Sequence, residues 1–477
     1  MKHKKLLIFL LSLLVFILPL VGVTALALGL PPAYGNTFLG EMPVKFDRLT
    51  SIDEPKVVVV GGSSVAFGLD STALEEMVGM PVVNYGLYAT LGTKFMIDTS
   101  KAGIGEGDIV ILAPEVNTQT YSLYFNSEAV WQAMDGDMSM LRYIPYANWG
   151  KLAGGIWNYA GTKYSYIRDD YTLDPSGIYA FSSFDENGDI IYGREFNIMV
   201  GDYDPTQLLT FDDSLLDEDF INYVNDYAAW CEGKGAKLYF SFSPMNGAAV
   251  PEDVTEEHIL AWYGKLATAL DCPVLSDIRD YIMDAQYFYD TNFHLNDTGV
   301  TVRTHRLGED ILRAKGDKTP ATLFLPAAPQ RPDDYFSVAD ADDTTGYFLY
   351  EENGDTLTLV GITDSGKEQD ELTLPISSEG KPVTTMAENA LAGCDSLKTV
   401  IIPKDTSLTL IYDGAFAGAA KLSRIEMEGS CAGITVADDL LKGTPSDCRI
   451  YVSHAYYGDF AGDYFWSKYM TKISMDN

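Results

Sequence analysis

The chain has 477 residues, 47% of them hydrophobic, and its 68 acidic and 33 basic residues give a net charge of −35. This length predicts about two to four domains, and the hydrophobic content excludes a globally disordered chain. The negative charge argues against a nucleic-acid partner, because phosphate binding needs a basic surface.

The N-terminus has the pattern of a membrane segment. Residues 1–5 (MKHKK) are basic, and residues 6–30 contain no charged side chain. This stretch is long enough to cross a bilayer and longer than the apolar core of a typical signal peptide. We therefore expect a transmembrane anchor over 1–30, with the N-terminus cytoplasmic and the rest of the chain outside, followed by a juxtamembrane linker over 31–55. The small residues of Ala25-Leu26-Ala27 leave cleavage and secretion as the alternative.

Residues 56–316 alternate between short apolar runs and segments with helical spacing, which predicts an α/β domain with a parallel sheet. Ligands bind beyond the carboxyl ends of the strands in such sheets. The expected strands are 56–60, 81–84, 108–113, 237–243 and 273–276, and the expected helices are 215–233, 255–270 and 297–315.

Two serines follow the first expected strand, in the sequence VVVVGGSS. Gly and Ser are ordinary turn residues, but a serine at this strand end is also placed to attack a ligand. Its hydroxyl would then need a base. Of five histidines, His294 stands out because it lies in a loop (YDTNFHLNDTG) before the last helix, four residues after Asp290. An acid in this position can orient an imidazole and stabilise its cation.

Residues 118–214 interrupt the alternation and are rich in Tyr and Trp. We interpret them as an insertion with its own small aromatic core, and alternatively as a lid on which sugar rings could stack. The segment 185–189 (DENGD) predicts an Asn-Gly hairpin turn and lacks the full calcium-loop pattern.

A Pro-, Ala- and Asp-rich stretch over 317–345 reads as a linker, and residues 346–477 carry a repeat. The period is 25 residues, which predicts a short solenoid of leucine-rich-repeat type. The aligned positions are Leu391 with Phe416, Gly393 with Gly418, Leu397 with Leu422 and Val400 with Ile425, and a weaker third copy has Leu441, Gly443 and Ile450. These residues resemble the BspA-like leucine-rich repeats of bacterial surface proteins, which implies a protein or cell-surface ligand.

The strand-end serines and the Asp/His loop together resemble the SGNH (GDSL-type) hydrolase family. The family pattern G-D-S-x-x-x-G fits Gly62 to Gly68 and places Ser64 at the nucleophile, with Ser63 where the family has aspartate. The register that would make Ser63 the nucleophile loses Gly68, so Ser63 is the second choice. The resemblance implies a flavodoxin-like α/β fold and an esterase, lipase, or carbohydrate O-acyltransferase or deacetylase.

The same resemblance implies roles for further residues. His294 is the base and Asp290 its orienting partner, although the D-x-x-H block is one residue longer here. The oxyanion donors are the backbone N–H of Ser64, a backbone N–H at Gly86 or Ala89, and the Asn117 amide. Pro114 and Glu115 stand in place of the residues usual in the block that contains Asn117, which weakens the case for Asn117 as a donor, and we expect Glu115 to change the shape of the pocket.

We therefore expect a membrane-anchored, extracytoplasmic serine esterase or O-acyltransferase that acts on acyl esters, such as acetyl esters, of cell-envelope or extracellular polysaccharide. The alternative is a catalytically inactive SGNH-like surface protein that serves adhesion or scaffolding through its repeats. Neither hypothesis needs a cofactor or a metal. The five cysteines have no CxxC spacing, so they do not indicate zinc, and an oxidising location would allow Cys231–Cys272 or Cys431–Cys448 to pair.

Overall fold

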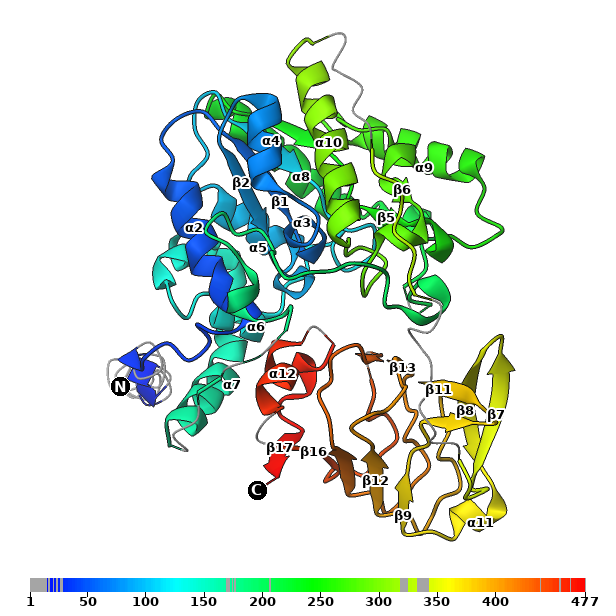
Figure 1. Ribbon diagram of the computed structural model, residues 1–477. Coiled ribbons are helices and arrows are strands. Elements are labelled where there is room, and N and C mark those ends of the chain that lie inside the picture. Colours follow the sequence, from blue (N-terminus) through cyan, green and yellow to red (C-terminus); the bar gives the residue numbers. More distant parts are fainter. Residues whose placement is uncertain are drawn as a thin grey trace, which may run out of the picture.

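A computed structural model shows an α/β domain joined to a repeat domain (Figure 1). It describes residues 15, 18–19, 21–22, 25, 29–168, 172–173, 175, 177–205, 207–317, 325–332, 343–437, 439–453, 456–463 and 465–476. The predicted anchor over 1–30 lies largely outside this set. Among the residues that are described, no helix is both long and apolar enough to span a membrane.

The α/β domain is built on four parallel strands in the order β2-β1-β3-β4. Their bounds are β1 Val57–Gly61, β2 Val82–Gly86, β3 Ile109–Leu112 and β4 Lys237–Phe240. This is the strand order of flavodoxin-like doubly wound sheets. Four predicted strands are confirmed, but the fifth, 273–276, is wrong as a full strand. It pairs with β4 only at Val274, because β4 ends at Phe240.

Both faces of the sheet are covered, which explains the unbroken valine run of β1. Val57 and Val59 point into a cluster that includes Leu74 of α4 (Ser71–Val78) and Leu307 of α10 (Asp297–Ala314). Val58 and Val60 point into the larger cluster on the opposite face. The helices α8 (Glu218–Gly233), α9 (Glu256–Ala269) and α10 confirm the three helical predictions, and α2 (Met42–Ser51) and α5 (Thr93–Ser100) complete the layers.

The insertion folds into helices that pack on the α/β domain. It contains α6 (Ser127–Ala133) and α7 (Trp149–Arg168), and Trp131 of α6 stacks on Tyr159 of α7 at 5.8 Å between ring centroids. Residues 185–189 form the predicted hairpin turn: Phe184 pairs with Ile190, and Gly188 has a φ of +78°. This aromatic core joins the main hydrophobic cluster, so the insertion is continuous with the domain beneath it.

The C-terminal domain is a solenoid in which the 25-residue period becomes strand register. Thr399 of β12 (Thr399–Ile402) pairs with Arg424 of β14 (Arg424–Met427), which pairs with Arg449 of β16 (Arg449–Ser453). Each step is 25 residues, and this confirms the repeat prediction. The remaining strands of this sheet are β9 (Glu371–Thr373) and β17 (Ile473–Asp476).

A second sheet runs along the other side of the solenoid with the same period. Met386, Ile411 and Val436 are register partners in β11 (Lys381–Met386), β13 (Leu410–Ile411) and β15 (Thr435–Val436). The sheet ends in a hairpin of β8 (Thr356–Ile362) and β7 (Phe348–Asn353), beside the short helix α11 (Asp364–Lys367). The domain boundaries at 317 and 345 stay a prediction.

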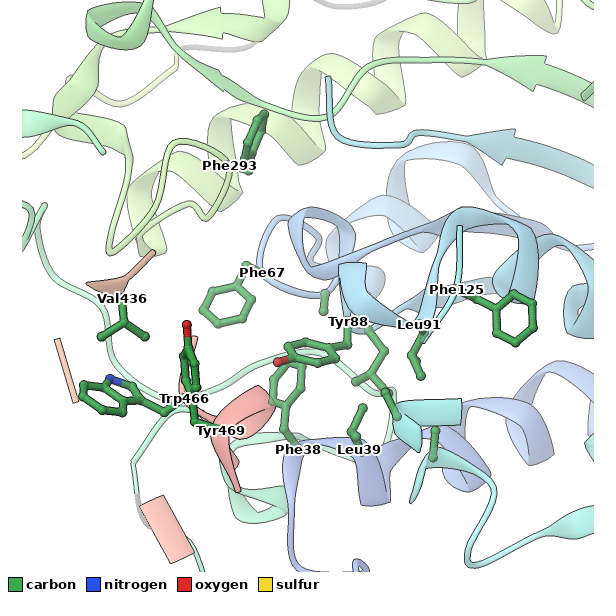
Figure 2. Close-up of a cluster of buried hydrophobic side chains, with 14 of the residues drawn as sticks. Phe38, Leu39, Phe67, Tyr88, Leu91, Phe125, Phe293, Val436, Trp466 and Tyr469 are labelled. Carbon is green, nitrogen blue, oxygen red and sulfur yellow. The ribbon is translucent and has the colours of Figure 1, made fainter. Parts of the chain in front are cut away.

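The repeat domain packs against the α/β domain through its C-terminal segment, α12 (Tyr457–Gly462) and the 3-10 turn after it. Figure 2 shows Trp466 and Tyr469 of this segment near Phe38 and Tyr88 of the α/β domain. All four side chains belong to one buried cluster. The Tyr88 hydroxyl lies 3.1 Å from the Ser467 hydroxyl. The two domains therefore share a core.

All five cysteines are free and buried, so neither Cys231–Cys272 nor Cys431–Cys448 forms a disulfide. Each thiol serves as a small apolar side chain in the core, and burial raises its pKa.

Candidate functional site

Residues 62–68, here called the serine turn, begin where β1 ends. Helix α3 (Ser63–Ala66) starts directly after this strand and lies close to the ends of the neighbouring strands β2 and β3. A Cβ on Gly61 would lie 2.7 Å from the Ala113 carbonyl oxygen, and one on Gly86 would lie 2.6 Å from a Val65 methyl carbon. Glycine at both positions lets the turn sit directly on the sheet edge. This packing buries the Ser64 side chain completely.

The predicted Asp/His pair is formed. Asp290 Oδ1 lies 2.9 Å from His294 Nδ1, so the extra residue in the loop does not separate the two side chains. The other oxygen, Asp290 Oδ2, accepts a 2.5 Å hydrogen bond from the Tyr179 hydroxyl. Burial and the nearby Asp290 charge raise the pKa of Tyr179, which keeps its hydroxyl a donor. With Asp290 accepting from Nδ1–H, the His294 Nε2 is left as the basic nitrogen.

The histidine ring is also fixed by stacking. It lies on the Phe67 ring at 3.9 Å between centroids and an interplanar angle of 11°. Phe67 is three residues after Ser64, so this contact places the imidazole beside the serine turn. The Ser64 hydroxyl, however, has no hydrogen-bond partner within the described part of the chain, and so it is not hydrogen-bonded to His294.

Two buried arginines hold the far end of the serine turn. Arg303 of α10 donates to the Gly68 carbonyl at 2.8 Å, and Arg194 of the insertion donates to the Phe67 carbonyl at 3.3 Å. Burial lowers the pKa of both guanidinium groups, that of Arg303 to about 10. These contacts tie the turn to the last helix and to the insertion.

The predicted oxyanion donors are largely engaged by other groups. Glu115 Oε1 accepts from the Ser64 backbone N–H at 3.0 Å and from the Ser63 hydroxyl at 2.9 Å. Glu115 Oε2 lies 3.5 Å from Asn117 Nδ2. The Gly86 N–H donates to the Asn84 side chain at 3.3 Å, whereas the Ala89 N–H has no acceptor among the described residues. Ala89 packs against Gly62, close to the serine turn.

A cavity of about 620 Å³ lies between the two domains and reaches the Asp290 side of the pair. Asp290 and Tyr179 line this cavity. Asp463 and Phe465 of the repeat domain also line it, together with threonines of successive coils, Thr384, Thr409 and Thr435. Burial, together with the weaker effect of the neighbouring Asp290 charge, raises the pKa of Asp463 to about 7. Ser64 and His294 do not line this cavity.

The structure brings the predicted residues His294 and Asp290 into a hydrogen bond, and His294 stacks on Phe67, three residues after Ser64. The sequence does not predict the contacts made by Phe67, Tyr179 and the two arginines, and it predicts for Glu115 only a change in the shape of the pocket. No group of three or more His, Cys, Asp or Glu side chains within the described ranges has the geometry of a metal site.

No protein-family model matches the sequence, and no curated protein matches it. Solved structures with limited similarity include two leucine-rich repeat proteins. The protein from Bacteroides capillosus is 19% identical over 24% of this chain and 99% of its own, with a TM-score of 0.17. The protein from Bacteroides ovatus is 14% identical over 24% of this chain and 38% of its own, with a TM-score of 0.16. The strand register of the C-terminal domain shows, without these comparisons, a solenoid with a 25-residue repeat.

Proposed function

We propose that the chain is an SGNH-like serine esterase or O-acyltransferase whose nucleophile is Ser64 and whose base is His294. The observation that carries the proposal is the Asp290–His294 hydrogen bond of 2.9 Å, on an imidazole stacked beside the serine turn. The flavodoxin-like strand order and the position of the turn at the carboxyl edge of the sheet support it.

In this mechanism His294 Nε2 takes the Ser64 proton while the hydroxyl oxygen attacks an ester carbonyl. Asp290 stabilises the imidazolium through Nδ1–H, and Tyr179 fixes the Asp290 carboxylate from its other side. The tetrahedral intermediate collapses to an acyl-enzyme, and the alcohol leaves with the proton from His294. Water or a sugar hydroxyl then accepts the acyl group. Ser64 must approach Nε2 on substrate binding, as catalytic hydrogen bonds often tighten only in the complex.

We further propose that the substrate is an acyl ester, such as an acetyl ester, of an extracellular or cell-envelope polysaccharide. This rests on the predicted anchor and outward orientation, and on the exposed aromatic residues of the insertion, Trp149 and Trp157 among them. The repeat domain would bind a protein or cell-surface ligand. No nucleic-acid partner is proposed, given the net charge of −35.

The second candidate is an inactive surface protein that uses its repeats for adhesion or scaffolding. Two observations favour it: the Ser64 side chain is completely buried, and its backbone N–H is bound to Glu115. Both features oppose acyl transfer in the packed conformation.

Hydrolysis of p-nitrophenyl acetate separates the two candidates. If the enzyme hypothesis is right, Ser64→Ala and His294→Gln abolish turnover and Asp290→Asn reduces it strongly. Ser51→Ala, at an exposed serine of α2, leaves it unchanged. Ser63→Ala tests the second register and is expected to retain turnover. Activity that persists in Ser64→Ala would exclude the mechanism, and absence of turnover in the intact protein would favour the scaffold.

A further inference from the structure

Glu115 lies at the same sheet edge as the serine turn. It follows β3 by three residues, and β1 and β3 are paired in register, with Val60 opposite Leu112. The pairing brings the segment after β3 next to Gly62 and Ser64. A Cβ on Gly62 would lie 3.1 Å from Glu115 Oε1, so only a glycine leaves the carboxylate its full space.

The Glu115 carboxylate is buried, with 3% of the residue exposed. Its contacts are all hydrogen-bond donors: the Ser64 N–H, the Ser63 hydroxyl and, at 3.5 Å, the Asn117 amide. No ion pair with Glu115 occurs in the described segments of the chain. The segment that carries it is fixed because the Thr120 hydroxyl donates to the Glu115 carbonyl.

These donors are the groups that acyl transfer would need. An oxyanion hole works by pointing N–H groups at the oxygen that becomes negative in the transition state. Here the Ser64 N–H already donates to a carboxylate oxygen. A second negatively charged oxygen at the same place would be repelled rather than stabilised.

We propose that Glu115 is a positioning residue that occupies the oxyanion hole of the resting protein, and that acyl transfer requires its carboxylate to leave this place. The inference rests on the proposed function, because it assumes that Ser64 is the nucleophile. The intact protein would then be a slow enzyme, because its own Glu115 carboxylate occupies the oxyanion hole. This also explains why the Asp290–His294 pair is formed while the nearby Ser64 N–H is already bound to Glu115.

The test is covalent capture of Ser64 in the full chain by a biotinylated alkyl fluorophosphonate. In this reaction the Ser64 oxygen forms a bond to phosphorus, the P–F bond breaks, fluoride leaves and His294 takes the serine proton. The labelling rate is followed by streptavidin blot, and the modified residue is located by mass spectrometry. Loss of one oxyanion donor typically costs about 100- to 1,000-fold in rate. We therefore expect Glu115→Ala to label at least about tenfold faster than wild type.

Two comparisons complete the experiment. Glu115→Gln is isosteric and serves as the control if Glu115→Ala does not fold. It is expected to label at a rate between those of wild type and Glu115→Ala, because it removes the charge but still fills the oxyanion hole. Ser64→Ala in the Glu115→Ala background is expected to abolish labelling. A purely structural role for Glu115 predicts a lower melting temperature and slower labelling, and that result overturns the inference.

The outcomes also separate this inference from the proposed function. Labelling of Ser64 in wild type that Glu115→Ala does not accelerate overturns the inference alone. Absence of labelling at Ser64 in wild type and in both Glu115 variants overturns the inference and the proposed function together.

Discussion

Asp463, in the C-terminal segment of the repeat domain, links the stability of the protein to pH. Its Oδ1 accepts from the backbone N–H groups of Phe465 at 2.8 Å and Trp466 at 3.0 Å. Burial raises its pKa to about 7 from the ordinary value of 3.8, and the charges of Asp290 and Asp459 act in the same direction. The folded protein therefore holds a proton on Asp463 at pH values where the unfolded chain has released it.

The direction in which stability changes with pH follows from this difference in proton binding. Because the folded-state pKa is raised, the stabilisation is complete below about pH 4 and is lost as the pH rises through 7. A pKa difference of roughly 3, at about 1.4 kcal/mol for each unit, corresponds to an upper limit of about 4 kcal/mol. Burial raises the pKa of Glu41 to about 7 as well, so part of the pH dependence has a second source.

We test this with Asp463→Asn, which keeps an oxygen acceptor for the two N–H groups and replaces the titratable carboxyl group with an amide. We expect the variant to gain stability relative to wild type by up to about 3 kcal/mol between pH 5 and pH 8, because roughly two of the pH units that separate the two pKa values lie in this range, at about 1.4 kcal/mol each. Urea unfolding followed by tryptophan fluorescence from pH 5 to 8 measures this. The control Asp405→Asn changes an exposed carboxylate and is expected to follow wild type. Equal pH slopes in wild type and Asp463→Asn would show that Asp463 does not contribute to the pH dependence of stability.

Three further predictions test packing. Gly86→Ala places a Cβ against Val65 and is expected to cost about 1–3 kcal/mol, whereas Gly105→Ala enters open space and leaves the melting temperature unchanged. Leu422→Ala removes a completely buried side chain of the repeat core and is expected to lower the free energy of unfolding by about 2–5 kcal/mol, as measured in urea. All five thiols are buried and free, so they should react with Ellman's reagent only on unfolding, and a reductant should not change the melting temperature; a reductant-sensitive melting temperature would indicate a disulfide.

The sequence determines element type well wherever a short-range pattern repeats. The valine run of β1 predicts a strand buried on both faces, and the 25-residue spacing of Val400 and Ile425 becomes the register of two paired strands. The 273–276 prediction fails because strand length depends on the partner, and β4 ends at Phe240. That limit is not visible in the apolar run itself.

In the candidate site too, contacts within one loop can be predicted from the sequence, whereas contacts between distant segments cannot. His294 and Asp290 are four residues apart, so their pairing can be inferred from one loop. The Tyr179 hydroxyl reaches Asp290 across 111 residues, and the bond from the Ser64 N–H to Glu115 spans 51. Contacts at such separations depend on which strand ends meet and on how the insertion folds back. Asn117 has the family's spacing, yet its amide faces Glu115, which no spacing rule reveals.

The shared core of the two domains bears on how a substrate could reach Ser64. Ser64 and His294 are buried, whereas Asp290 lines the interdomain cavity, as does Asp463. Solvent therefore approaches the pair from the carboxylate side. An ester could reach Ser64, the proposed nucleophile, only if the packing around the serine turn changed. Ionisation of Asp463 opposes the packed arrangement by placing a second buried charge near Asp290. The repeat domain is thus part of the environment of the site, because Asp463 lines the same cavity as Asp290.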